Sequence, residues 1–289
     1  ISKGRAPRLG SECSTKLKPV SVPLSAIKQR FMTKLRNNME SMMREKIGAV
    51  VLAAGKGSRM KSQVHKQYLE LLGHPLAVYC IAALEEKVDE IVLVASPGEE
   101  EYCRQTLVEP YGFQKVKAIV PGGKERYHSV YAGLQELSDC THVLIQDSAR
   151  PCLTDSIIER CIAGAREYGA CVAAMPSKDT IKRVSEEGYA VETPDRRSLW
   201  IIQTPQAFSY PIVFGAYSRM MQEDDGSLPV TDDAMVVEHW SENRVYMVEG
   251  AYENIKVTTP EDLDVAALYL KKQGFSRLLE VSEKKNKKM

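Results

Sequence analysis

The residues best suited to chemistry lie in a glycine-containing loop that is followed by two cations. Gly55 and Gly57 are separated by one residue, so the backbone there can turn sharply and bring free amide N–H groups close to phosphate oxygens. Arg59 and Lys66 follow and bring positive charge to the same stretch. The glycines alone would be equally consistent with a simple strand-to-helix turn. Together with both cations they predict a polyphosphate site.

Two common phosphate-binding motifs do not describe this loop. A dinucleotide-binding fingerprint needs a small residue where Met60 stands, and a P-loop needs Lys and then Ser or Thr directly after its second glycine. Positioned cations can stabilise charge that develops on a transferred phosphate without a covalent intermediate. Arg59 and Lys66 are therefore predicted to do this for a nucleotidyl phosphate, and the alternative is that they are ordinary surface cations.

A carboxylate follows another apolar run. Asp147 comes directly after a predicted strand at residues 142–145. Mg²⁺ takes few protein oxygens and otherwise uses water and phosphate, so a single carboxylate beside a phosphate loop suits it. Asp147 is therefore predicted to help hold Mg²⁺. The alternatives are a helix N-cap or an ion pair with Arg150.

Two further cations stand in β-prone surroundings. Lys256 lies within a predicted strand at residues 254–257, where a charge needs either a ligand or an exposed strand face. Arg196 follows a predicted hairpin and has Arg197 beside it, so a solvated position is the simpler interpretation. The five histidines show no metal-binding spacing, and no serine stands in a nucleophile-elbow setting, so neither a zinc site nor a hydrolytic triad is expected.

The predicted elements would bring these residues to one edge of a sheet. An uninterrupted apolar run at residues 47–54 suits a strand that is covered on both faces. Further strands are predicted at residues 91–95, 116–120, 142–145, 170–175, 199–202, 244–249 and 254–257. Helices are predicted at residues 75–87, 99–107, 125–137, 157–168, 210–222 and 260–270, with another opening at Thr231.

This alternation predicts an α/β fold with a doubly wound, mainly parallel, Rossmann-like sheet. Ligand groups in such sheets lie at the carboxyl ends of the strands. Gly55, Gly123 and Asp147 each follow a predicted strand, so we expect them on one edge. Residues 178–197 contain two short β-prone runs around a polar turn and predict a protruding hairpin arm. A lone hairpin is marginal in water, so we expect the arm to pack on something, such as a second subunit.

Composition bounds the class of protein. The 289 residues are 44% hydrophobic and 27% charged, as in soluble globular proteins, and residues 47–272 suit one large domain. No apolar run is long enough for a membrane span, so no membrane partner is expected. Seven cysteines without a Cys-x-x-Cys pair suggest reduced thiols in a cytoplasmic protein, with neither a zinc site nor a disulfide framework.

Charge is distributed unevenly along the chain. Residues 1–46 carry a surplus of eight positive charges and residues 273–289 a surplus of three, and since the whole chain is +1, the middle carries −10. An acidic middle argues against a nucleic-acid partner. The basic leader, residues 1–46, lacks hydrophobic periodicity and is expected to be a vector-derived or mistranslated extension, with an organellar transit peptide as the alternative. The tail at residues 273–289 is expected to be a solvated end.

Several short strings occur together in a fixed order, and they cover roughly residues 47–270. They are residues 53–60 (AAGKGSRM), 65–66 (HK), 122–126 (GGKER), 147–151 (DSARP), 178–183 (KDTIKR), 199–200 (LW), 203–206 (QTPQ), 231–234 (TDDA) and 254–258 (NIKVT). In these strings the chain resembles the 2-C-methyl-D-erythritol 4-phosphate cytidylyltransferases of the non-mevalonate isoprenoid pathway. The resemblance implies an enzyme that uses CTP, methylerythritol phosphate and Mg²⁺ to make the CDP-alcohol and pyrophosphate.

The resemblance also implies roles for particular residues. Arg59 and Lys66 would stabilise the transition state, while Arg196 and Lys256 would position the acceptor phosphate. The nucleotide side, including the residues that select cytosine, would comprise Ala53, Ala54, Gly55, Gly57, Gly123 and Ser129. The acceptor side would comprise Asp147, Arg150, Thr180, Thr204 and Thr231. In this family the hairpin arms are exchanged between two subunits, which implies a homodimer in which Arg196 reaches the partner's site.

Two rival functions remain open at this point. Ribitol 5-phosphate cytidylyltransferase is a sister activity with the same loop and carboxylate, and it differs only in the alcohol phosphate. A nucleotide-binding protein that keeps the fold without catalysis belongs to a different class. The presence of Arg59, Lys66, Asp147 and Lys256 favours an enzyme over that second alternative.

Overall fold

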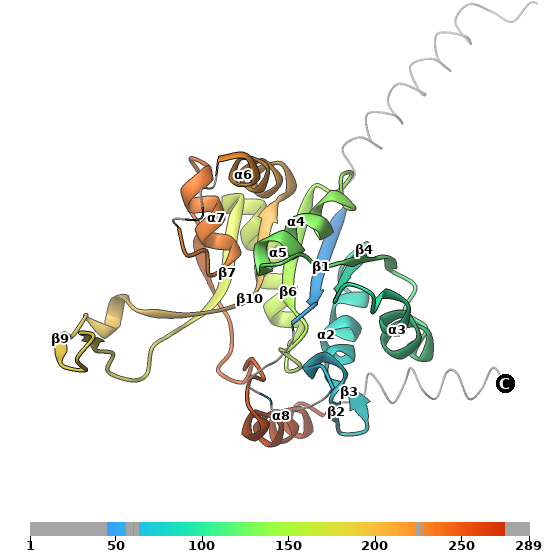
Figure 1. Cartoon of the computed structure of the whole chain (residues 1–289), viewed down its shortest axis with the longest axis horizontal. Coiled ribbons are helices and arrows are strands. Elements are labelled where there is room, and N and C mark those ends of the chain that lie inside the picture. The colour runs from blue at the N-terminus through green and yellow to red at the C-terminus, as the bar shows by residue number, and fades with distance from the viewer. Residues whose placement is uncertain (1–44, 56–59, 61–63, 224–225, 227, 275–289) are drawn as a thin grey trace, which may run out of the picture. The chain divides into compact units, whose positions relative to one another are not determined.

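The computed structural model of the chain describes residues 45–55, 60, 64–223, 226 and 228–274. Its centre is a seven-stranded sheet in the order β11-β7-β10-β6-β1-β4-β5 (Figure 1). The strands are β1 (Ile47–Ala53), β4 (Glu90–Ala95), β5 (Val116–Pro121), β6 (His142–Asp147), β7 (Ala170–Pro176), β10 (Trp200–Ser209) and β11 (Tyr246–Glu249). Strand β10 runs antiparallel to both of its neighbours, and the other pairs are parallel. The predicted mainly parallel α/β sheet is confirmed.

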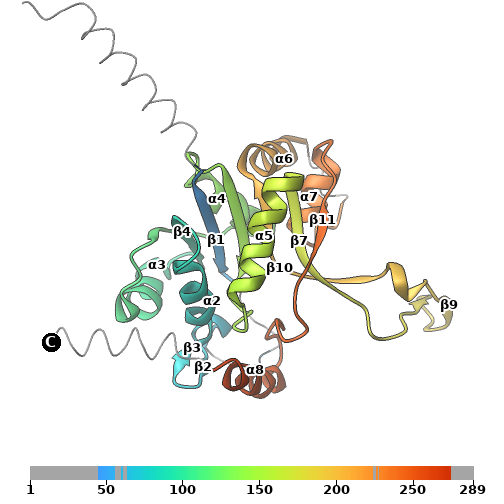
Figure 2. The same ribbon diagram turned by 180° about the vertical axis from the view of Figure 1, so that it is seen from behind.

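Helices cover both faces of the sheet because the apolar residues of each strand alternate between two cores. Val51 of β1 belongs to one core and Val50 to the other, and Leu144 of β6 likewise alternates with Val143. The first core is completed by α2 (Leu76–Glu85), α5 (Asp155–Tyr168) and α8 (Pro260–Lys272). The second is completed by α4 (Arg126–Gln135), α6 (Tyr210–Glu223) and α7 (Asp233–Trp240). Figure 2 shows α5 lying across the sheet.

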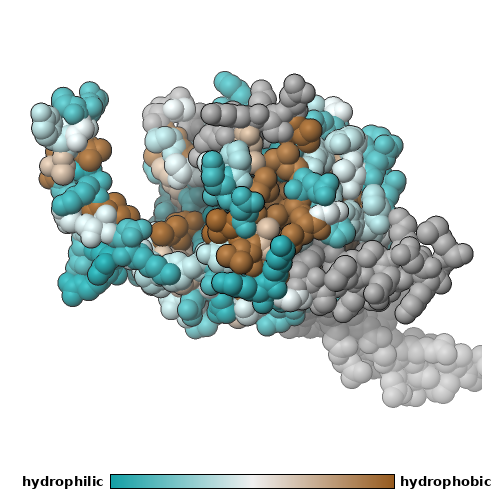
Figure 3. Space-filling view, turned by 90° about the horizontal axis from the view of Figure 1, so that it is seen from below, coloured by the Kyte–Doolittle hydropathy of each residue, from teal (hydrophilic) through white to brown (hydrophobic). Residues whose placement is uncertain are grey.

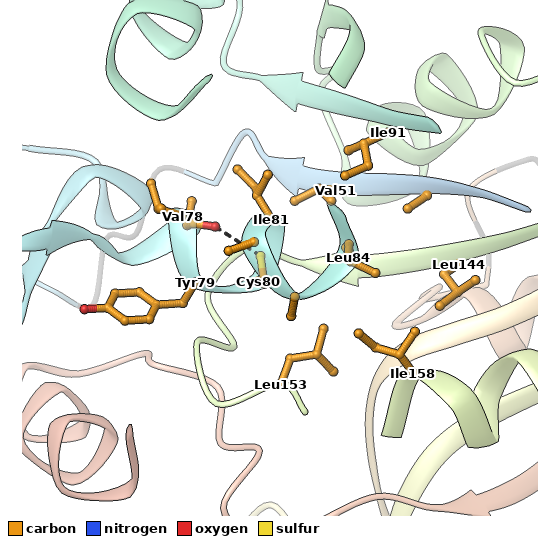
Figure 4. Close-up of a cluster of buried hydrophobic side chains, with 14 of the residues drawn as sticks. Val51, Val78, Tyr79, Cys80, Ile81, Leu84, Ile91, Leu144, Leu153 and Ile158 are labelled. Carbon is orange, nitrogen blue, oxygen red and sulfur yellow. Dashed lines mark hydrogen bonds between the residues drawn. The ribbon is translucent and has the colours of Figure 1, made fainter. Parts of the chain in front are cut away.

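Helix α2 is buried along nearly its whole length, so its apolar residues do not form a single stripe. Figure 4 shows Ile81 and Leu84 of this helix beside Val51 of β1, with Leu144 and Ile158 close to them. A helix that is hydrophobic all round is typical of a position inside a protein. The helix therefore fixes one side of the parallel strands that carry the site.

Smaller elements complete the body. Residues Glu100–Cys103 form α3, which continues into the π-helix η3 (Arg104–Val108) and the 3-10 helix η4 (Glu109–Tyr111). A two-stranded ribbon, β2 (Glu70–Leu71) with β3 (His74–Pro75), was not predicted. Every helix in the described part of the chain is too short or too polar to cross a membrane. The six described cysteines are all buried and form no disulfide.

Two predicted elements differ from the structure. The segment at residues 254–257 is not a strand, because its polar groups bond to loops at the sheet edge: the Val257 amide donates to the Ala149 carbonyl (2.8 Å). The strand predicted at residues 199–202 is part of the much longer β10, which continues to Ser209. Its register shifts between Ile202 and Gln206, so the strand bends at that point.

The arm is a short antiparallel hairpin of β8 (Arg183–Val184) and β9 (Ala190–Glu192), followed by η5 (Arg196–Ser198). It extends away from the sheet on two long connections (Figure 1). Val184, Tyr189 and Val191 are 58%, 75% and 53% exposed. The space-filling view shows apolar side chains among polar ones along this projection (Figure 3, at left). The predicted arm is therefore present, and it buries little of its own apolar surface.

Candidate active site

A pocket of about 800 Å³ opens at the carboxyl edge of the sheet. Register explains the position, because Ala53 of β1 pairs with Ala95 of β4 and Leu52 of β1 pairs with Asp147 of β6, so these strands end together. Seven of the predicted residues line this pocket: Ala54, Gly55, Lys66, Gly123, Ser129, Asp147 and Lys256. The rule that ligands bind where parallel strands end therefore located the site.

One side of the pocket is a turn that packs closely on the start of α4. The Gly123 amide donates to the Ser129 hydroxyl (3.1 Å), and that hydroxyl donates to the Glu125 carbonyl (3.3 Å). A Cβ atom on Gly122 would lie 2.6 Å from the Ala54 side chain, and one on Gly123 would collide with His128. Glycine is needed at both positions for this close approach. Both glycines therefore leave their part of this side of the pocket without side chains.

Lys66 lies beside Gly55, the described residue of the glycine loop. Its Cε is 3.7 Å from the place where a Cβ atom on Gly55 would stand. The residue opens the 3-10 helix η2 (Lys66–Tyr68) and lines the pocket. The structure therefore brings Lys66 and Gly55 together. The other two loop predictions, Gly57 and Arg59, lie outside the described residues.

The residue before Lys66 is held by a carboxylate in the pocket wall. His65 Nδ1 lies 3.0 Å from Glu99 Oε1, and the Ser96 hydroxyl lies 3.4 Å from the same nitrogen. The Tyr68 hydroxyl also reaches Glu99 (3.4 Å). These contacts fix both ends of the short helix that presents Lys66. Sequence reasoning missed His65 because it lacks metal-binding spacing, and only the chain's path brings Glu99 beside it.

Asp147 is buried and lies between two cations. Lys256 Nζ is 2.6 Å from its Oδ2, and Arg126 Nη2 is 3.5 Å from its Oδ1. Burial opposes ionisation of this carboxyl, but the charges of Arg126, Lys256 and Arg150 outweigh that effect and hold its pKa below the usual range. The Asp147 amide donates to the Thr204 hydroxyl (3.1 Å). A carboxylate that is charged at neutral pH therefore anchors Lys256 at the pocket.

Arg150 is turned away from the predicted partner Asp147. Its Nη1 donates to the Asn254 carbonyl (2.7 Å) and its Nη2 to the Ile202 carbonyl (3.4 Å). The Asn254 amide group in turn donates to the Thr204 carbonyl (2.9 Å). These bonds tie the segment that carries Lys256 to β10 at the point where its register shifts. In the structure, Arg150 holds the segment at Asn254 against β10, and the Thr204 hydroxyl bonds to the backbone of Asp147.

The remaining predicted residues lie apart from the described lining of the pocket. Ala53 is buried within β1. Thr180 and Arg196 are exposed on the arm, where Arg196 Nη1 donates to the Lys178 carbonyl (3.0 Å). Thr231 is exposed just before α7, and its hydroxyl lies 3.8 Å from the Met235 sulfur. Within one copy of the chain, these three polar side chains are therefore not brought to the pocket.

Comparison with known proteins places this architecture in one family. Residues 47–272 match the family model described as 2-C-methyl-D-erythritol 4-phosphate cytidylyltransferase. A protein of that name from Lachnospira eligens is 47% identical over 227 residues, which cover 77% of this chain and 98% of the relative. Another from Pelotomaculum thermopropionicum is 46% identical over 234 residues, which cover 80% of this chain and 97% of the relative.

Solved structures agree with the sequence relatives. The 4-diphosphocytidyl-2C-methyl-D-erythritol synthase of Anaerococcus prevotii superposes with a TM-score of 0.68 at 31% identity, covering 78% of this chain and 96% of the other. The 2-C-methyl-D-erythritol 4-phosphate cytidylyltransferase of Thermus thermophilus gives a TM-score of 0.62 at 26% identity, covering 77% and 98%. The chain belongs to the 2-C-methyl-D-erythritol 4-phosphate cytidylyltransferase family and is a nucleotidyltransferase.

Proposed function

We propose that the pocket binds CTP and an alcohol phosphate, and that it transfers CMP to 2-C-methyl-D-erythritol 4-phosphate with release of pyrophosphate. The observation that carries this proposal is the meeting of Gly55, Gly123, Lys66 and the Asp147–Lys256 pair at one sheet edge. Backbone amides and a lysine suit a triphosphate, while a second, separately anchored lysine suits another phosphate. Family membership favours methylerythritol phosphate over ribitol phosphate as the acceptor.

The roles follow from these positions. The turn at Gly123 and Ser129 would hold the cytosine ring, with backbone groups supplying much of the recognition. Lys66, together with Arg59, would neutralise charge as the bond between the α- and β-phosphates breaks. Lys256, held by Asp147, would orient the acceptor phosphate so that one of its oxygens attacks the α-phosphorus in line. Catalysis of this kind needs placement and charge, and it needs no covalent intermediate.

Asp147 also suits a limited role toward Mg²⁺. In the part of the chain that the structure describes, its Oδ1 contacts Arg126 at 3.5 Å, and a carboxylate oxygen has a further lone pair that could contact a cation. One carboxylate with water and substrate phosphates is a common Mg²⁺ environment. When bound, Mg²⁺ would neutralise phosphate charge. Removal of divalent ions with a chelator is expected to abolish turnover, and restored turnover on adding Mg²⁺ would support this role.

We further propose that the protein acts as a homodimer through the arm. Arg196 is remote from the pocket of its own chain, and the arm carries exposed Val184, Tyr189 and Val191. An isolated two-stranded hairpin with such residues is marginal in water. A partner subunit would cover these side chains and receive Arg196 close to its own Lys256.

Pyrophosphate release with defined substrates tests the proposal. The full chain is expected to release pyrophosphate with CTP, Mg²⁺ and 2-C-methyl-D-erythritol 4-phosphate, and to do so much more slowly when ribitol 5-phosphate replaces the acceptor. If ribitol 5-phosphate supported turnover and 2-C-methyl-D-erythritol 4-phosphate did not, the proposed acceptor would be wrong. Binding of CTP without pyrophosphate release from either acceptor would instead support a non-catalytic protein.

A further inference from the structure

A continuous line of polar contacts runs from the second hydrophobic core to the pocket. The Tyr217 hydroxyl donates to Asp233 Oδ1 (2.5 Å), and Arg126 places Nη1 on Oδ1 and Nη2 on Oδ2 of the same carboxylate, both at 2.7 Å. Arg126 Nη2 then lies 3.5 Å from Asp147, whose other oxygen contacts Lys256 at 2.6 Å. Elements α6, α7, α4 and β6 thus contribute one residue each before the line reaches Lys256.

The two ends of this line differ most in exposure. The Asp233 side chain is 0% exposed and the Lys256 side chain 37%, with Arg126 at 29% and Asp147 at 11% between them. The Asp233 end of the line is therefore buried in the core, while Arg126 lines the pocket. Burial works against the charge on Arg126, but Asp233 and Asp147 outweigh it and hold the guanidinium pKa above its usual value. Negative and positive charges alternate from Asp233 to Lys256, so each charged side chain has a partner of opposite sign.

We propose that Arg126 is a positioning residue of the site: fixed by the buried Asp233, it sets the place of the Asp147 carboxylate and thereby the direction in which Lys256 meets the acceptor phosphate. This inference rests on the proposed function of the pocket. The two parallel bonds to Asp233 fix the plane of the guanidinium group, which a single bond would leave free to rotate. Asp147 then has one cation whose place is fixed and one, Lys256, that can meet a ligand.

Substitutions in an ion pair that only stabilises the fold would have different effects from those expected for a positioning residue. Breaking a buried pair destabilises a protein wherever the pair lies, whereas a positioning role affects one substrate and one step. Arg126→Lys keeps the positive charge but cannot make the two-pronged contact with Asp233. We expect kcat/KM for the alcohol phosphate to fall by about 10- to 100-fold, since small misplacements near the reacting groups are costly. KM for CTP should stay within about twofold, because the Arg126 guanidinium bonds to Asp233 and Asp147, whereas the contact of the Gly123 amide with the Ser129 hydroxyl does not use it.

The experiment is a double-mutant cycle on the full chain. Steady-state kinetics with each substrate varied in turn are measured for Arg126→Lys, Asp147→Asn and the pair. If both residues act as one unit, the double variant should lose little beyond Asp147→Asn alone. Fully additive losses in kcat/KM, or an equal rise in KM for CTP, would refute the positioning role. An inactive wild-type enzyme would instead refute the proposed function itself.

Two further variants separate misfolding from misplacement. Tyr217→Phe removes only the hydroxyl that contacts Asp233 and keeps the ring, so it should fold and lower the same kcat/KM by about threefold, a modest effect as expected for a group acting through others. The matched control is Glu90→Gln, which breaks a buried pair with Lys46 (2.8 Å) at the amino end of β4. It should lower the melting temperature and leave kcat/KM unchanged. If Tyr217→Phe changes only the melting temperature, as the control does, the inference fails.

Discussion

The Lys66 side chain lies beside Gly55 in the pocket, so its removal tests the chemistry directly. Lys66→Ala is expected to lower kcat by about 10²- to 10³-fold, the usual effect of losing one group that stabilises a transition state. KM for CTP should change little, because a contact that strengthens only in the transition state affects kcat most. Steady-state pyrophosphate release measures both. Lys271→Ala, on the exposed end of α8, is the control, and near-normal kcat in Lys66→Ala would contradict the role.

Asp147 gives a prediction for pH. Its carboxyl pKa is lower in the folded protein than in the unfolded chain, so its stabilising effect is complete above the unfolded value and is lost as pH falls through the folded one. The difference in free energy of unfolding between the wild type and Asp147→Asn should therefore be constant at neutral pH and shrink below about pH 4. Urea unfolding at pH 3 to 7 measures it. A difference that grows on acidification would contradict the ion pairs described here.

Several of the residues that the sequence indicated stand at or next to the ends of strands. Gly55 follows β1, Gly123 follows β5 and Asp147 ends β6, so a rule about strand ends is enough to bring them together. Arg126 was not singled out because its partner Asp233 is 107 residues away and no spacing pattern joins them. Such a pair is created only when α4 and α7 pack on the same face of the sheet.

At the scale of elements, the hydrophobic pattern predicted the sheet well. It failed where a segment is held by hydrogen bonds to loops and not by pairing in a sheet. Strands such as β1 and β4 are continuous apolar runs, and their burial on both faces follows directly. The segment at residues 254–257 has strand-like composition, yet Asn254 bonds to Thr204 within β10 and Val257 bonds to the loop after β6. Lys256 is therefore presented by a loop tied at several points, which composition does not reveal.

Helix α4 shows how one glycine controls the placement of a whole element. A Cβ atom on Gly133 would lie 2.5 Å from Val50 Cγ1 and 3.1 Å from Val94 Cγ2, so the helix can approach the sheet only with glycine there. Gly133→Ala is expected to destabilise the fold by about 1–3 kcal/mol, the usual cost of overpacking. Because α4 carries Ser129, whose hydroxyl accepts from the Gly123 amide, KM for CTP should rise as well. Thermal or urea unfolding and steady-state kinetics measure the two effects.

A second helical glycine supplies the control for Gly133. No atom lies within 4 Å of a Cβ added to Gly215 of α6, so Gly215→Ala meets no obstacle. Alanine favours a helix over glycine by up to about 1 kcal/mol, so this variant should be neutral or slightly more stable. Equal destabilisation by the two substitutions would show that the close approach of α4 to the sheet is not what makes Gly133 necessary.

At the scale of the whole molecule, the body and the arm differ in how far they bury their apolar residues. The body buries its apolar residues in two cores, one on each face of the sheet. The arm leaves Val184, Tyr189 and Val191 exposed and holds Arg196 away from the pocket of its own chain. The sequence predicted the arm from its two β-prone runs and the turn between them. What the arm contacts cannot come from local pattern, because contacts with another chain leave no periodicity in this one.

Mixed dimers test whether Arg196 serves the partner's site. Arg196→Ala and Lys66→Ala should each be nearly inactive alone. In a dimer of one of each, the subunit that keeps Lys66 would receive an intact Arg196 from its partner, so one complete site forms. Random mixing should then restore about a quarter of wild-type activity, since half of the dimers are mixed and each has one good site of two. If Arg196 acted within its own chain, no mixture would contain a complete site.

The control must show that mixed dimers form and that the arm holds the two subunits together. Differently tagged subunits purified through both tags supply a population of mixed dimers whose activity can be assigned to one combination. Tyr189→Asp with Val191→Asp places charges on the exposed face of the arm, where a partner would have to desolvate them. This variant should elute as a smaller species and restore no activity on mixing. Tyr102→Ser, at a ring on α3 that is 51% exposed, should still elute as a dimer and restore activity on mixing. Purified mixed dimers without activity would exclude exchange of Arg196 between subunits.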